Sequence, residues 1–120
     1  TYYDDEDTIG YLAAEERATG AFIGSFALRD LDGTDKTELG YRLHKAFWGK
    51  GYATEGSQAL IQYAFEKLNL KDLVAVVKPE HVASQRVLEK CGFEYQRLAF
   101  YYRTQVRYYE LHKTRWELAQ

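Results

Sequence analysis

The sequence predicts an α+β fold in which helices pack on a mixed sheet. Residues 22–28 alternate so that Phe22, Gly24, Phe26 and Leu28 share one face, as in a strand with one buried side. Apolar residues between 53 and 68 recur at three- and four-residue spacing, which is typical of an amphipathic helix lying on a sheet. Residues 72–77, "DLVAVV", form a continuous apolar run, which is typical of a strand covered on both faces.

The remaining elements complete the order three strands, helix, strand, helix, two strands. The predicted strands cover residues 9–16, 20–29, 38–44, 72–77, 94–102 and 106–118. The predicted helices run from Gly51 to about Asn69 and within 79–93, where Gly92 is the expected C-terminal cap. In the second helix, Ser84 shares a stripe with Leu88 and Cys91, so its side chain should point inward.

Composition limits the class of protein. A chain of 120 residues with 46% hydrophobic residues is long enough for one domain with its own core. Its net charge of −2 gives no broad basic field, so we expect no nucleic-acid partner. The single cysteine, Cys91, excludes a disulfide framework and a multi-thiolate metal site. Neither a signal peptide nor an apolar run near the roughly 18 residues needed to span a bilayer is visible, so we expect a cytoplasmic protein without membrane partners.

The stretch "FWGKGYATEG", residues 47–56, carries the main chemical signal. It lies between a predicted strand and the start of a predicted helix, where backbone amides are unpaired and the helix dipole favours an anion. Glycines at 49 and 51 allow the backbone to approach phosphate oxygens, and Lys50 adds positive charge. The spacing fits neither a Walker loop nor the dinucleotide fingerprint, so on its own the segment favours a simple turn over a phosphate site.

Two motifs in order resemble the GNAT superfamily of acetyl-CoA-dependent N-acetyltransferases. The phosphate loop of that family, Gln/Arg-x-x-Gly-x-Gly/Ala, corresponds here to Trp48-x-x-Gly51-x-Ala53. The phrase "LGYRLHKAFWGKGYATEG" resembles the Rim-type branch, which acetylates the N-termini of ribosomal proteins. Downstream, "VAVVKPEHVASQRVLEKCGFEYQ" resembles the motif of that branch that contains Asn-x-x-Ser and Lys-x-Gly-Phe. The resemblance covers roughly residues 9 to 113.

The resemblance implies a GNAT-like fold: a mostly antiparallel sheet with one splayed parallel pair, here 38–44 and 72–77. It implies acetyl-CoA as cosubstrate and no metal. Leu43 would offer backbone groups to pantetheine, and Ser84 would lie near the thioester sulfur. The cofactor-binding residues would be Leu43, Trp48, Gly49, Lys50, Gly51, Tyr52, Ala53, Thr54, His81 and Ser84.

Three positions depart from the family pattern. Trp48 stands at the Gln/Arg position and cannot supply a charge, and His81 stands at the Asn position. A neutral histidine donates and accepts only through opposite ring edges, unlike an amide. Leu88 occupies the place of the tyrosine acid found in many members, so protonation of the leaving thiolate would fall to Ser84 or to water.

The expected reaction is direct attack of a primary amine on the thioester. Glu38, on the strand beside the cofactor, is the leading candidate for the base, and its alternative is a solvent-facing glutamate at a strand end. His44, predicted on the same strand face, is the second candidate. A peptide α-amine, with a pKa of about 7.7–8.0, is neutral far more often than a lysine amine near 10.4. This favours an N-terminal amine over polyamines, aminoglycosides and other small amines.

Other interpretations stay open. The family fold begins with a further strand and one or two helices, so residues 1–120 are expected to be an N-terminally incomplete domain that opens in the acidic segment "TYYDDED". Such a chain could be a non-catalytic CoA-binding or partner-binding module that has lost its acceptor pocket. It could also be a structural remnant that pairs through an edge strand. A homodimer stays open as well.

Overall fold

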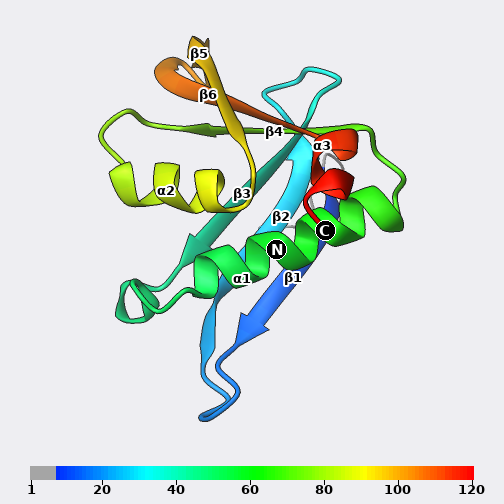
Figure 1. Ribbon diagram of the computed structural model, residues 1–120. Coiled ribbons are helices and arrows are strands. Elements are labelled where there is room, and N and C mark those ends of the chain that lie inside the picture. Colours follow the sequence, from blue (N-terminus) through cyan, green and yellow to red (C-terminus); the bar gives the residue numbers. More distant parts are fainter. Residues whose placement is uncertain (1–7) are drawn as a thin grey trace.

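The computed structural model describes residues 8–120, which form one mixed sheet with three α-helices (Figure 1). The acidic opening segment lies outside the described residues. The strands follow the order β1-β2-β3-β4-β6-β5, and only β3 and β4 run parallel. The elements are β1 (Thr8–Glu15), β2 (Phe22–Asp30), β3 (Thr37–Leu43), α1 (Tyr52–Glu66), β4 (Asp72–Val77), α2 (Val82–Lys90), β5 (Glu94–Tyr101), β6 (Thr104–His112) and α3 (Lys113–Leu118). The predicted fold class is confirmed.

The end of the chain differs from the prediction. The predicted strand 106–118 stops at His112, and Lys113–Leu118 form the helix α3. His112 pairs with Asp72, the first residue of β4, so the chain beyond it has no neighbouring strand to bond. A helix satisfies its backbone internally, and it places Trp116 against Phe65 of α1, with the ring centroids 5.3 Å apart.

The turn between β5 and β6 also lies elsewhere than predicted. The prediction placed it at residues 103–105, whereas β5 ends at Tyr101 and β6 begins at Thr104. Tyr102 and Arg103 both have positive φ, 52° and 62°. This combination is typical of a type I′ hairpin turn, whose twist matches the flanking strands.

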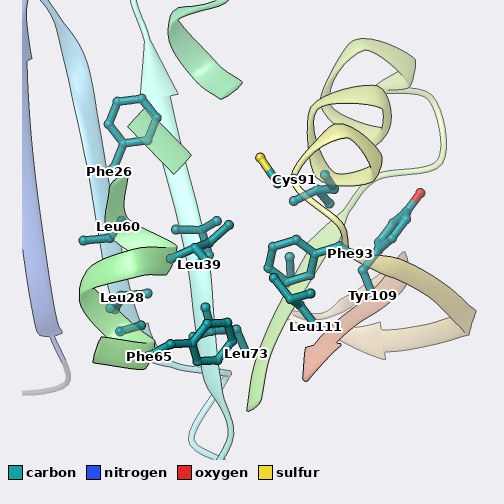
Figure 2. Close-up of a cluster of buried hydrophobic side chains, with 14 of the residues drawn as sticks. Phe26, Leu28, Leu39, Leu60, Phe65, Leu73, Cys91, Phe93, Tyr109 and Leu111 are labelled. Atoms are coloured by element: carbon teal, nitrogen blue, oxygen red, sulfur yellow. The ribbon is translucent and has the colours of Figure 1, made fainter. Parts of the chain in front are cut away.

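The main core lies between the sheet and helices α1 and α2, which cover the same face. Figure 2 shows two groups of side chains, one beneath α1 and one beside α2. Gly56 lets α1 lie close to β2, because a Cβ atom there would come within 2.2 Å of the Phe26 ring. The fully or nearly buried members include Phe26, Leu28, Leu39, Leu60, Phe65, Leu73, Cys91, Phe93, Tyr109 and Leu111.

A smaller apolar cluster lies on the other face of the sheet. Its buried members are Leu31, Val74 and Tyr108, with Tyr101 packed against them. Within residues 8–120, no helix has the length and apolar character needed to cross a bilayer. The two clusters place the interior of the sheet between apolar layers, so strand β4 is covered on both faces as its apolar run predicts.

The parallel pair separates after its first contact. Glu38 and Val74 are the only paired residues of β3 and β4, although β3 continues to Leu43 and β4 to Val77. In Figure 1 strands β3 and β4 run in diverging directions; along the chain, α1 follows β3 and α2 follows β4. The β3 backbone beyond Glu38 therefore has no β4 partner, and the predicted splay of the pair is confirmed. We call the Glu38–Val74 contact the closed end, and the ends of β3 and β4 the open end.

Candidate active site between two diverging strands

The loop at the open end has the backbone conformation of an anion cradle. Gly49 and Gly51 have φ values of 78° and 81°, which residues with a Cβ rarely adopt. Gly51 is the N-cap of α1 and supplies no side-chain cap, so the first amides of the helix have no partner within it. A Cβ built at either glycine would meet no atom within 4 Å, so both glycine Cα atoms border open space.

The side chains of Lys50 and Tyr52 turn toward the β1–β2 turn. The Tyr52 hydroxyl donates to Glu16 Oε2 at 2.8 Å, and Lys50 Nζ lies 4.0 Å from the same oxygen. Hydrogen bonds from Tyr52 and Thr19 lower the pKa of Glu16. Tyr52 therefore offers the loop its backbone amide, while its side chain ties the loop to the neighbouring hairpin.

Trp48 lies at the rim of the open end. Its side chain is 61% exposed, and its indole Nε1 donates to the carbonyl oxygen of Leu43 at 3.1 Å. A carbonyl oxygen accepts two hydrogen bonds, so Leu43 retains one acceptor position. Ala53 and Thr54 lie in the first turn of α1, and the Thr54 carbonyl accepts a weak bond from Cys91 Sγ at 3.8 Å.

Glu38 lies at the closed end and is 7% exposed. The alternative of a solvent-facing glutamate is therefore excluded. The Tyr102 hydroxyl donates to its carboxylate, and the same hydroxyl accepts from the backbone N–H of Asp32 at 3.0 Å. The Tyr102 N–H donates to Asp32 Oδ2 at 2.7 Å, which joins the β5–β6 turn to the β2–β3 loop. Burial raises the pKa of Glu38, while the hydrogen bond from Tyr102 and the charge of Arg29 lower it.

Neither of the two candidate histidines, His44 and His81, joins this carboxylate. His44 follows Glu38 by six residues, which corresponds to about 20 Å along a strand, so the two candidate bases lie far apart. It is exposed, and its ring packs edge-on against Phe22 at 5.4 Å. His81 is exposed at the N-cap of α2 and makes no side-chain cap bond there. Its ring has no hydrogen-bond partner among residues 8–120.

Ser84 points inward, as its place in the helix stripe predicts. It is half-buried in the first turn of α2, and its Oγ accepts a hydrogen bond from the Tyr41 hydroxyl of β3 at 3.2 Å. Leu88 is buried in the main core, so it takes no part at the open end. Tyr41 was missed as a functional candidate. Its only signal in the sequence is its place on the same strand face as Leu39 and Leu43.

The structure also has a hollow that the predicted site residues do not line. It has a volume of about 1150 Å³ and is bordered by α1, the end of α2 and α3, with Cys91 and Trp116 in its wall. The chemically equipped region is therefore the splayed pair, which combines a buried carboxylate, two hydroxyls and open backbone amides.

Comparisons with known proteins identify the family. The family model described as Acetyltransferase (GNAT) domain matches residues 1–94. The chain is 44% identical over 98 residues to "Probable N-acetyltransferase YjcK" of Bacillus subtilis, a match that covers 80% of this chain and 52% of that protein. The chain spans about half or less of the length of the curated relatives it matches.

Solved structures share the same arrangement of strands and helices. An acetyltransferase from Agrobacterium tumefaciens superposes with a TM-score of 0.75 at 34% identity, over 86% of this chain and 60% of that one. A ribosomal-protein-S5-alanine acetyltransferase from Vibrio fischeri gives a TM-score of 0.77 over 88% of this chain and 62% of that one, and its 20% identity supports the fold alone. From the matched family model and these relatives, we conclude that the chain belongs to the GNAT acetyltransferase family.

Proposed function

We propose that this protein transfers the acetyl group of acetyl-CoA to a primary amine by direct attack in a ternary complex. The observation that carries the proposal is the splayed pair. Beyond Glu38 and Val74 the strands form no further ladder pair, the open end carries a glycine loop at a helix N-terminus, and the closed end carries a buried carboxylate. Family membership supports the same reaction class.

The residues of the open end fit the polar groups of acetyl-CoA. The amides from Gly49 to Thr54 would hold the pyrophosphate, because they lie at the positive end of α1 and the two glycines among them border open space. Lys50 would add charge by leaving its long contact with Glu16. The unpaired β3 edge near Leu43 would bond pantetheine as an added strand would, with Trp48 at the rim and His81 on the opposite arm.

Glu38 is the proposed general base. An amine attacks only in its neutral form, so the base has to remove a proton from the incoming ammonium group, directly or through water. Burial raises the pKa of Glu38 toward the working range of a base, and the Tyr102 hydroxyl holds its carboxylate in place. The thioester carbonyl would be polarised by backbone N–H groups of β3, which lack a β4 partner beyond Glu38.

The proposed acceptor is a peptide or protein N-terminal α-amine, and the second choice is a small primary amine. An α-amine has a pKa of about 7.7–8.0, so a useful fraction is neutral at pH 7. A lysine-type amine near 10.4 would need stronger help from the site. A site with one buried carboxylate as its base is better matched to an α-amine than to a lysine-type amine.

The test measures binding and turnover on the same sample. The melting temperature is recorded with and without acetyl-CoA, since a ligand at 100 times its Kd adds about 2.7 kcal/mol to the free energy of unfolding. Release of free thiol is then followed against a panel of peptides with free N-termini, polyamines and aminoglycosides. We expect stabilisation by acetyl-CoA and the fastest thiol release with peptides.

Each outcome decides between functions. No stabilisation at millimolar acetyl-CoA would overturn the proposal. Stabilisation without thiol release against any amine would favour a CoA-binding module. Faster thiol release with polyamines than with peptides would support the proposed reaction but would show that the acceptor is a polyamine and not a peptide N-terminus.

A further inference from the structure

Tyr41 and Ser84 connect the two arms of the splay beyond their last backbone contact. Tyr41 belongs to β3 and Ser84 to α2, 43 residues apart in sequence, and their hydroxyl oxygens are 3.2 Å apart. Tyr41 follows Glu38 by three residues, so it lies about 10 Å further along β3 toward the open end. The contact therefore spans the region where β3 and β4 themselves no longer pair.

The two hydroxyls lie on the face of the sheet opposite to Glu38. Tyr41 packs against Phe26 in the main core beneath the helices, with ring centroids 5.7 Å apart. Residues separated by an odd number along a strand point to opposite faces, so Glu38 faces the smaller cluster that contains Val74. With the base on one face and the two hydroxyls on the other, removal of a proton from the amine would be separated in space from delivery of a proton to the leaving group.

The direction of the hydrogen bond leaves one hydrogen uncommitted. A serine hydroxyl has one hydrogen to donate, and here its oxygen accepts from Tyr41. Among residues 8–120, no acceptor receives the hydrogen of Ser84. A hydroxyl that already accepts a hydrogen bond is a stronger donor through its own hydrogen. Ser84 is thus prepared to donate to an atom that arrives between the arms.

The surroundings of Tyr41 keep its phenol neutral. Burial raises its pKa, and only the hydrogen bond to Ser84 opposes that effect. The side chains that interact with it include Phe26 from β2, Ser84 from α2 and Cys91 after α2, and burial raises the pKa of the Cys91 thiol to about 11. Tyr41 therefore keeps its phenol proton at neutral pH.

We propose that Tyr41 is a positioning residue for the leaving thiol and acts through Ser84. The inference rests on the proposed function. When the carbon–sulfur bond of the thioester breaks, its electron pair stays on sulfur, and the Ser84 proton passes to that sulfur. The Tyr41 proton passes to Ser84 Oγ, and water restores the proton of Tyr41. The pair would thereby supply the proton that a tyrosine acid supplies in many family members, at the position that Leu88 occupies in this chain.

The first test needs no acceptor amine. The thiol of CoA bound to the protein is titrated by the ultraviolet absorbance of its thiolate, in the wild type and in Tyr41→Phe. The substitution keeps the ring on Phe26 and removes only the hydroxyl. We expect the pKa of the bound thiol to rise by on the order of half a unit in Tyr41→Phe, because Ser84 then donates less strongly to the thiolate.

The matched control is Tyr63→Phe, which removes a hydroxyl from the exposed face of α1. It should leave the pKa of the bound thiol unchanged. Failure of the wild type to bind CoA would overturn the proposed function and this inference together. If CoA binds and its thiol has the same pKa in the wild type and in Tyr41→Phe, the inference alone would be overturned.

The second test uses turnover with the fastest amine of the panel. Tyr41→Phe should lower kcat about tenfold or more while the KM for acetyl-CoA stays within about twofold, as expected for a proton-transfer role. Ser84→Ala should lose at least as much, and the double variant should be no slower than Ser84→Ala alone. Independent, multiplicative losses in the double variant would contradict action of Tyr41 through Ser84.

Discussion

The two ends of the β3–β4 pair differ in nearly every physical respect. At the closed end, the strands are bonded at Glu38 and Val74, and the carboxylate is buried beneath the Tyr102 hydroxyl. At the open end, the strands are apart, the glycines face empty space, and Trp48 is largely exposed. At the closed end the polar groups are hydrogen-bonded to other protein atoms. At the open end, backbone amides and one hydroxyl are available to bind another molecule.

This difference explains how one sheet can both hold a base and receive a long cofactor. A catalytic carboxylate needs a fixed environment, which long-range contacts from two separate loops provide at Glu38. A cofactor that binds as an added strand needs unpaired backbone, which only the separated part of β3 provides. Variants at each end should therefore change different measured quantities.

The largest expected effect comes from Glu38→Gln at the closed end. The amide cannot accept the proton of the amine, so kcat should fall by about 10²–10⁴. The affinity for acetyl-CoA, measured by titration, should stay near that of the wild type because the loop at the open end is untouched. Glu89→Gln, on the exposed side of α2, is the matched control and should keep the wild-type rate. An unchanged rate in Glu38→Gln would place the base elsewhere.

Gly51→Asp should be the strongest change at the open end. The added carboxylate lies before the first amides of α1 and would repel a pyrophosphate, so the Kd for acetyl-CoA should rise at least about tenfold. Gly33→Asp separates this effect from backbone strain, because Gly33 has a φ of 78°, also faces open space and lies in the β2–β3 loop. Equal losses of affinity in both variants would remove the loop as the pyrophosphate site.

Tyr102→Phe should give a smaller effect with a distinct signature. The Tyr102 hydrogen bond lowers the pKa of Glu38, so its removal raises that pKa further. A base works only when it is deprotonated, so kcat of the variant should rise at a higher pH than kcat of the wild type. At pH 7, kcat should fall by less than about tenfold. The rate should recover as the pH increases. A pH-independent loss would show that Tyr102 acts on the fold and leaves the titration of Glu38 unchanged.

Local patterns predicted much of this molecule. The alternation in β2, the stripe of α1 and the apolar run of β4 reflect periodicities of single elements, and β4 was placed at its observed bounds. The glycine loop could be predicted because a few adjacent residues determine both its positive φ angles and the start of the helix. Its role in holding acetyl-CoA stays a prediction.

Other features depend on residues that are far apart in the chain. The sequence by itself determined the fold class, the order of most elements and the loop that precedes α1, because each follows from neighbouring residues. Only the tertiary structure decided that Tyr102 covers Glu38, that Tyr41 reaches Ser84 and that residues after His112 turn into α3. Those outcomes depend on which strands become neighbours and where a strand loses its partner, and no local periodicity encodes that information.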